Sequence, residues 1–389
     1  MEIKVNNKTA PFNTLNVITI SFAHLVHDAY ASFLSPLLPL LITKLSLNYS
    51  IAGFLSFTLG LPSLLNPFVG IIADKLPLRY LVISAPFLTA FAMSMLGLAN
   101  NLGLLLLLLF AAGTSSTLFH VPSPVIVKQV SGNRIGRGMS YFMLGGEGAR
   151  TLGPLIVLGT VSHWGLEGCW RLVLPGFMMS IFLYLRLGHT VIERKQKLSE
   201  YKTDPWRAFN KERTYFTALS GIFLMRAAMQ SSLMLFLPTY LITKGESLWF
   251  GGIALALLQF AGAGGTLIAG SLSDSIGRKL TLLISTGLSP VLIILFTMMS
   301  GVPAIILLIP TGLLLFANGP VLLATVQDIE TDNPAFLNSI FMTLSFISGS
   351  VAAVLVGMSG DIIGLTATYR LACVLAFAAI PFIIKLPDR

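Results

Sequence analysis

The sequence predicts an all-α membrane protein in which twelve transmembrane helices form two six-helix bundles. Two observations lead to this prediction: an apolar composition and an internal repeat. Of 389 residues, 54% are hydrophobic and only 11% are charged, against roughly 25% charged in ordinary soluble domains. Lipid tails solvate such an apolar surface, and water does not. We therefore expect this chain to reside in a lipid bilayer.

The repeat concerns the polar segment that follows the second apolar run. An equivalent segment follows the eighth run, and the glycine and the aspartate of the two copies are each 200 residues apart. A chain that repeats itself at about half its length is typical of transporters built from two similar bundles. The residues of the two copies are Gly70, Asp74 and Lys75, and then Gly270, Asp274, Gly277, Arg278 and Lys279.

A helix needs about 20 apolar residues to cross the hydrocarbon core. Twelve runs meet this length: 15–43, 49–72, 79–99, 102–127, 137–162, 169–187, 214–242, 249–273, 279–299, 303–327, 335–360 and 367–386.

These runs divide the chain into an N-terminal bundle (1–187), a linker (188–213) and a C-terminal bundle (214–389). The linker carries both charge signs. We predict a solvated cytoplasmic segment, with a short amphipathic helix on anionic lipid as the alternative.

The positions of the basic residues predict the orientation. With both termini in the cytoplasm, 19 of the 25 Lys and Arg residues fall in cytoplasmic segments. Only Lys44, Arg171, Lys244 and Arg370 fall on the other side, and two more lie inside spans. Because cytoplasmic loops of membrane proteins are enriched in Lys and Arg, we expect a multi-pass protein of the inner (plasma) membrane with cytoplasmic termini. The net charge of +9 thus reflects topology, and we expect no nucleic-acid partner.

Ionisable side chains inside a membrane are costly, so those found there are functional candidates. In the first span His24, His27 and Asp28 share one helical face, because their spacing is i, i+3 and i+4. We expect Asp28 to carry a proton, assisted by His24 or His27. Further candidates, for substrate binding, are His120, Glu147, Arg150, Arg226, Gln230 and Asn318.

Simpler explanations compete with several of these assignments. Glu147 and Arg150 lie at i and i+3 and have the spacing of a structural ion pair. An alternative for His120 and His24 is that each is a neutral histidine with a purely structural role. The spacing of His24, His27 and Asp28 also permits two ligands at one metal ion, but no cysteine cluster supports it, since Cys169 and Cys373 lie far apart. We expect no metal and no other cofactor.

Residues 145–148 read Gly-Gly-Glu-Gly, which suggests a phosphate loop only superficially. The Lys-Ser/Thr that would follow it is missing, and the segment lies within a span. We expect close helix packing there instead.

Two six-helix halves with this repeated loop resemble the major facilitator superfamily. The resemblance covers essentially the whole chain, although Leu76-Pro77-Leu78 departs from the loop signature in the first copy. It implies that Asp74 and Asp274 help latch one conformational state through helix ends, and that Gly70 and Gly270 allow close helix approach.

Three stretches also resemble the fosmidomycin resistance proteins, a family of drug–proton antiporters. That family typically has Pro-Glu after the Phe119-His120 pair, whereas this chain has Val121-Pro122, and its charges Glu147 and Arg150 stand where small or neutral residues are expected. The matching stretches are Ser21 to Asp28 with Leu34 to Leu41, Phe119-His120 with Val130 to Gly136, and Gly145-Gly146 with Leu152 to Leu155.

These features predict a monomeric secondary transporter that works by alternating access of its two bundles. The favoured function is antiport: export of a small anionic or amphipathic compound or drug in exchange for protons. Arg150 and Arg226 are expected to attract the negative group of the substrate. The alternative is a proton-coupled importer (symporter) of an organic anion. A membrane enzyme or a sensor is disfavoured, because the sequence shows no convincing catalytic set and no appended soluble domain.

Overall fold

The computed structural model describes residues 12–66, 78–132, 134–188, 205–331 and 334–386. Almost all of these residues are helical, and none of them forms a strand. Within these ranges, nine helices are long and apolar enough to cross a membrane, and Tyr49–Leu65 adds a shorter apolar helix. The prediction of an all-helical membrane protein is confirmed.

The chain forms two compact units. Unit one comprises residues 1–37 and 58–196, and unit two comprises residues 38–57 and 197–389. The boundary falls inside two helices, so that residues 38–57 take their contacts from the C-terminal part of the chain.

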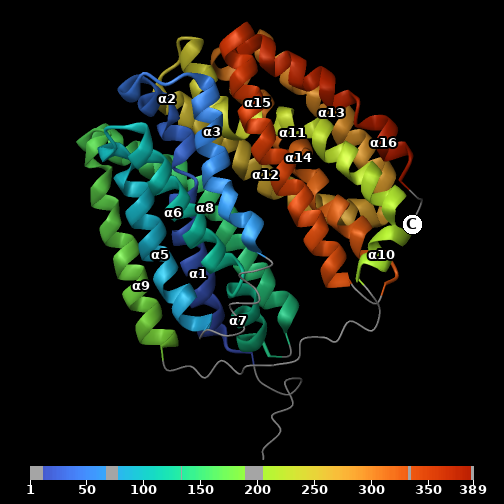
Figure 1. Ribbon diagram of the computed structural model, residues 1–389, viewed down its shortest axis with the longest axis horizontal. Coiled ribbons are helices and arrows are strands. Elements are labelled where there is room, and N and C mark those ends of the chain that lie inside the picture. Colours follow the sequence, from blue (N-terminus) through green and yellow to red (C-terminus); the bar gives the residue numbers. More distant parts are fainter. Residues whose placement is uncertain (1–11, 67–77, 133, 189–204, 332–333, 387–389) are drawn as a thin grey trace, which may run out of the picture. The chain divides into compact units, whose positions relative to one another are not determined.

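The helices of the N-terminal part correspond to the first six predicted spans (Figure 1). They are α1 (Thr14–Ala31), α2 (Leu34–Leu45), α3 (Tyr49–Gly60) with η1 (Leu61–Leu65), α5 (Leu78–Ser94) with η2 (Met95–Leu98), α6 (Leu102–His120), α7 (Ser123–Val130), α8 (Ile135–Trp164), and η3 (Glu167–Leu172) with α9 (Val173–Leu187).

Two of these predicted spans are interrupted. The first divides into α1 and α2 at Ser32–Phe33, and the fourth divides into α6 and α7 at Val121–Pro122. Proline lacks a backbone N–H and clashes with the preceding turn, which explains the second break. Interrupted membrane helices expose backbone polar groups and often line binding sites.

Glycines allow α1 and α8 to pack closely within unit one. A Cβ on Gly145 would overlap the carbonyl oxygen of Ser21, and one on Gly146 would lie 2.6 Å from Cε1 of His24. The Gly-Gly-Glu-Gly segment lies inside α8. It therefore serves helix packing, as the sequence predicted, and brings the backbone of α8 directly against His24.

Unit two contains the helices of the last six spans together with residues 38–57. Gly364 (φ 76°) separates two helices inside α15, so this element covers most of the eleventh and twelfth predicted spans. The helices are α10 (Pro205–Lys211), α11 (Arg213–Thr243), α12 (Leu248–Ile276), α13 (Arg278–Met298), α14 (Gly301–Gln327), α15 (Pro334–Phe377) and α16 (Ile380–Ile384).

The described end of the linker is helical. α10 packs against α11 and α15, and its Phe209 ring lies 5.4 Å from that of Phe216. Phe209 is half-buried against the core of unit two, while Trp206, Arg207, Asn210 and Lys211 are exposed, and the prediction of a cytoplasmic linker stays a prediction. The remainder of the linker, 189–204, lies outside the described residues.

Candidate functional site

The helical break after α1 positions Asp28 in the last turn of that helix. The backbone N–H of Ser32 donates to the carbonyl oxygen of Asp28 at 3.1 Å and ends the helix. The Asp28 side chain is buried, with only 8% of the residue exposed. A buried carboxylate needs a cation or hydrogen-bond donors, so the groups facing it define the site.

His24 lies one turn before Asp28 and faces it directly. Its Nε2 is 3.2 Å from Oδ2 of Asp28, while its Nδ1 lies 2.7 Å from the carbonyl oxygen of Phe142 on α8. The ring also stacks on that of Phe142, with centroids 4.0 Å apart. These contacts fix the orientation of the imidazole.

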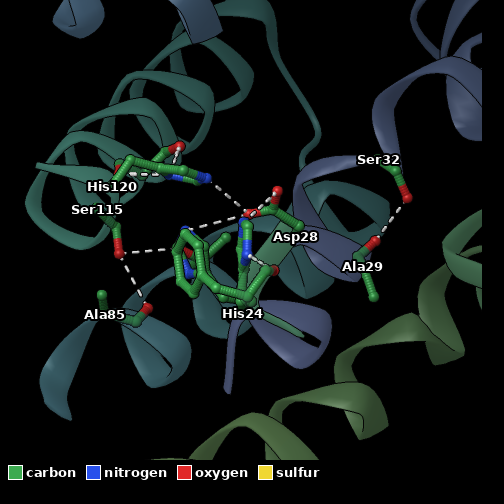
Figure 2. Close-up of polar contacts among 11 residues, drawn as sticks. His24, Asp28, Ala29, Ser32, Ala85, Ser115 and His120 are labelled. Atoms are coloured by element: carbon green, nitrogen blue, oxygen red, sulfur yellow. Dashed lines mark hydrogen bonds and ion pairs between the residues drawn. The ribbon is translucent and has the colours of Figure 1, made fainter. Parts of the chain in front are cut away.

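His120 reaches the other carboxylate oxygen from a different helix. As the final residue of α6, it places Nε2 3.2 Å from Oδ1 of Asp28. Its Nδ1 lies 2.9 Å from the carbonyl oxygen of Ser116. Figure 2 shows His24 and His120 approaching the carboxylate separately, each joined to it by a dashed line. We call these three side chains the His–Asp–His cluster.

The hydrogen bonds decide where the protons of the two imidazoles lie. A carbonyl oxygen only accepts, so Nδ1 of each ring must carry the proton. In a neutral ring Nε2 is then a lone pair, and in both rings it points at the carboxylate. Lone pairs facing lone pairs repel, so this arrangement requires a proton between them, on an Nε2 or on the carboxylate, or a bound cation.

His27 completes the polar face of α1 without joining the cluster closely. It is fully buried and stacks on Phe119 with centroids 4.4 Å apart. Its Nε2 lies 4.0 Å from Oδ1 of Asp28, beyond hydrogen-bond distance. The structure therefore favours His24 and His120 over His27 as direct partners of the carboxylate.

Glu147 and Arg150 form an ion pair on α8, with Nη1 and Oε1 3.3 Å apart. The guanidinium side chain is 38% exposed. The two residues therefore form the structural ion pair that their spacing allowed.

Arg226 on α11 is buried, with 5% exposed. Its Nη2 donates a long hydrogen bond of 3.4 Å to the carbonyl oxygen of Leu315, and no acidic side chain among the described residues pairs with it. Gln230, one turn later, is exposed. An unpaired buried guanidinium suits the binding of an anion.

Asn318 on α14 is engaged in structural hydrogen bonds. Its Oδ1 accepts from Ser285 at 3.1 Å and from Thr286 at 3.2 Å, and its Nδ2 donates to Leu314. These bonds link α13 to α14 and use its amide. The geometry therefore indicates helix association and offers no support for substrate contact.

Asp28, His120 and Arg150 belong to unit one, and Arg226, Gln230 and Asn318 belong to unit two. The prediction that both sets share one pocket stays a prediction.

The second copy of the repeated loop connects α12 to α13. Gly277 has φ +93°, a conformation that favours glycine. Arg278 pairs with Asp274 and, at 3.4 Å, with Asp328. Asp274 therefore meets a guanidinium, and no described residue lies within 4 Å of a Cβ built on Gly270. The close approach expected at Gly270 is not found within the described part of the chain, and the role predicted for Lys279 stays a prediction.

The first copy of the loop, with Gly70, Asp74 and Lys75, lies outside the described residues. Its role as a latch stays a prediction.

Sequence reasoning missed one polar contact, at Asp361 on α15. Its carboxylate accepts from the backbone N–H groups of Tyr49 and Ser50 at 2.7 and 2.8 Å and from the Ser50 hydroxyl. It thereby caps the start of α3 across 312 residues of sequence. A single acidic residue near the end of a predicted span gave no signal for this partner.

Comparison with known proteins agrees with this architecture. Residues 20–353 match the Major Facilitator Superfamily. The chain is 27% identical to the fosmidomycin resistance protein of Escherichia coli, over 95% of this chain and 92% of that protein. It is 22% identical to the multidrug resistance protein MdtG of Klebsiella pneumoniae, over 75% and 73% of the two chains.

Solved structures show the same fold at lower identity. The nucleoside transporter NupG superposes with a TM-score of 0.80 at 12% identity, covering 97% of this chain and 100% of that one. An inward-facing, unoccupied bacterial homologue of the human lysosomal transporter Spinster gives 0.75 at 15%, covering 95% and 94%. The predicted resemblance is confirmed: the match covers most of the chain, which is a multi-pass membrane transporter belonging to the Major Facilitator Superfamily.

Proposed function

We propose that this chain is a proton-coupled secondary transporter of the inner membrane, with cytoplasmic termini, that exports a small anionic or amphipathic compound. The observation that carries the coupling is the His–Asp–His cluster. Its two Nε2 atoms face one carboxylate at 3.2 Å each, an arrangement that requires a proton or another cation. Gain and loss of that proton is the event we assign to the transport cycle.

The net charge of the His–Asp–His cluster changes when the proton is lost. With one proton, the two imidazoles and the carboxylate carry no net charge, and without it they carry one negative charge. Arg150 is offset by Glu147 at 3.3 Å. Because charge interactions are strong in a medium of low dielectric constant, loss of the proton changes the local field that a charged substrate experiences.

The direction of transport is proposed from the relatives. The Escherichia coli and Klebsiella pneumoniae relatives are named as resistance proteins for fosmidomycin and for multiple drugs. Export of a comparable compound is consistent with the unpaired guanidinium of Arg226, which supplies a partner for an anionic group. Fosmidomycin is therefore the first probe compound to test.

A second candidate, a symporter of an organic anion, is favoured by the accessibility of Arg150. Its guanidinium side chain is 38% exposed and belongs to the same unit as the cluster, so an anion bound there would favour a proton on the cluster. Proton and anion would then bind together and move in the same direction. Antiport instead requires that they bind in turn.

Purified protein in liposomes loaded with a pH-sensitive dye distinguishes these functions. For antiport, we expect fosmidomycin or a related anion to release protons from the compartment into which it moves. For symport, the compound and protons enter together. Asp28→Asn, which keeps the shape of the side chain but removes its charge, is expected to abolish proton movement in either case. Unchanged proton movement in this variant would refute coupling at Asp28.

A further inference from the structure

We propose that the His–Asp–His cluster is a binding site for one divalent transition-metal ion of the zinc class. The ligand atoms are Nε2 of His24, Nε2 of His120 and a carboxylate oxygen of Asp28. This inference does not depend on the direction or coupling of transport. It departs from the expectation of no metal, because α6 supplies a ligand, His120, that the spacing on α1 alone does not predict.

The donor set suits such an ion. Two imidazole nitrogens and one carboxylate oxygen are typical ligands of Zn²⁺ and its neighbours, and three protein ligands leave a coordination position open. The three ligand atoms all lie within 4.8 Å of one another. Ligands about 2.1 Å from a tetrahedral ion are about 3.4 Å apart. Here Nε2 of His24 lies 3.2 Å from Oδ2 of Asp28, and Nε2 of His120 lies 3.2 Å from Oδ1 of the same carboxylate.

The surroundings of the rings are those of metal-binding histidines. A metal-bound imidazole usually donates its second N–H to a backbone carbonyl or a carboxylate, which fixes the tautomer and turns the other nitrogen toward the ion. His24 does so to Phe142 at 2.7 Å, and His120 to Ser116 at 2.9 Å. Both free nitrogens consequently point toward Asp28.

Two of the ligand atoms are buried and lack a hydrogen-bond partner, which is a second indication of a bound cation. His24 Nε2 and Asp28 Oδ1 are buried and satisfy no hydrogen bond in the structure, although both side chains are nine-tenths buried or more. The side chain of His120 is 38% exposed, which offers an ion a route to the site. A cation at this point would interact with both of these atoms and with Nε2 of His120.

The ion and the proton require the same atoms. Metal ligands must be deprotonated, so binding of Zn²⁺ displaces protons from the cluster. A bound ion would therefore occupy the site in place of the proton that we assign to transport.

The test is titration of the purified full-length protein, with its affinity tag removed, by Zn²⁺ in a calorimeter and by Co²⁺ in a visible spectrophotometer. We expect one ion per chain and Co²⁺ absorption bands of a low-coordinate N/O site. His120→Ala and Asp28→Asn are each expected to weaken binding by at least about 10-fold. Gel filtration and circular dichroism check that both variants remain folded.

His163→Ala is the matched control. This exposed histidine also bonds Nδ1 to a carbonyl one turn earlier, that of Gly159 at 3.0 Å, but makes no ion pair with a carboxylate within the described part of the chain. Its removal should leave the affinity unchanged. The proposal is overturned if folded wild-type protein shows no saturable one-to-one binding, if either His120→Ala or Asp28→Asn binds as tightly as wild type, or if His163→Ala alone loses the ion.

Discussion

At the scale of single residues, the three ionisable side chains on one face of α1 differ in their contacts. His24, His27 and Asp28 all lie on the predicted face and are all buried. Only the structure separates His27, stacked on Phe119, from His24, which contacts the carboxylate. His120 was predicted as a candidate, yet its contact with Asp28 across 92 residues follows from tertiary packing alone.

Arg226 gives a prediction that separates function from stability. A buried charge that lacks a partner destabilises the fold, so Arg226→Met, of similar length and no charge, should raise the midpoint of thermal unfolding. A gain of about 1 kcal/mol corresponds to about 2–4 °C in a domain of this size. The measurement is thermal denaturation in detergent.

The same variant should lose any stabilisation that an added anionic probe gives to the wild type. Asn318→Ala serves as the opposite case, because it breaks the hydrogen bonds to Ser285 and Thr286 and should lower the midpoint. A lower midpoint for Arg226→Met would indicate a structural partner and contradict the proposed role.

At the scale of helices, packing distances decide which glycines matter. Gly146→Ala would place a methyl group 2.6 Å from the His24 ring. Overpacking of this kind costs about 1–3 kcal/mol, and the displaced ring would lose its bond to Phe142. We expect a lower unfolding midpoint together with impaired proton movement in liposomes.

Gly159→Ala, on the same helix, is the control for this effect. No described atom lies within 4 Å of the added Cβ, and alanine is favoured over glycine in helices by up to about 1 kcal/mol. Its midpoint should stay the same or rise. Equal losses in both variants would mean that close packing against His24 is not the cause.

The cap on α3 leads to a further prediction for helix ends. Asp361→Asn keeps the shape of the side chain but weakens its bonds to the N–H groups of Tyr49 and Ser50, because the charge that favours a helix N-terminus is lost. We expect a loss of about 1–2 kcal/mol, measured as a lower unfolding midpoint.

Asp274→Asn is the comparison for this cap. Asp274 pairs with Arg278, but its side chain is 67% exposed, and exposed pairs contribute about 0–1 kcal/mol. A larger effect at Asp274 than at Asp361 would contradict the importance of the cap.

At the scale of the whole molecule, the distribution of charge leads to a topological prediction. Because 19 of 25 basic residues would face the cytoplasm, green fluorescent protein fused after Gln196 should fluoresce. Alkaline phosphatase, active only outside the cytoplasm, should be active when fused after Gly165 and inactive after Gln196. The reverse pattern would invert the proposed orientation, although the fold would stand.

The sequence by itself determined the membrane environment, the all-helical fold and the ionisable residues inside the spans. These properties depend on composition and on local periodicity, and both can be read from a single segment of the chain. Only the tertiary structure decided that α6 and α8 bring a histidine, an imidazole-binding carbonyl and a pair of glycines to α1, or that Asp361 caps α3. Such contacts join residues 92 to 312 positions apart. Hydrophobic patterning does not predict them, because many packings of the same helices bury the same apolar faces.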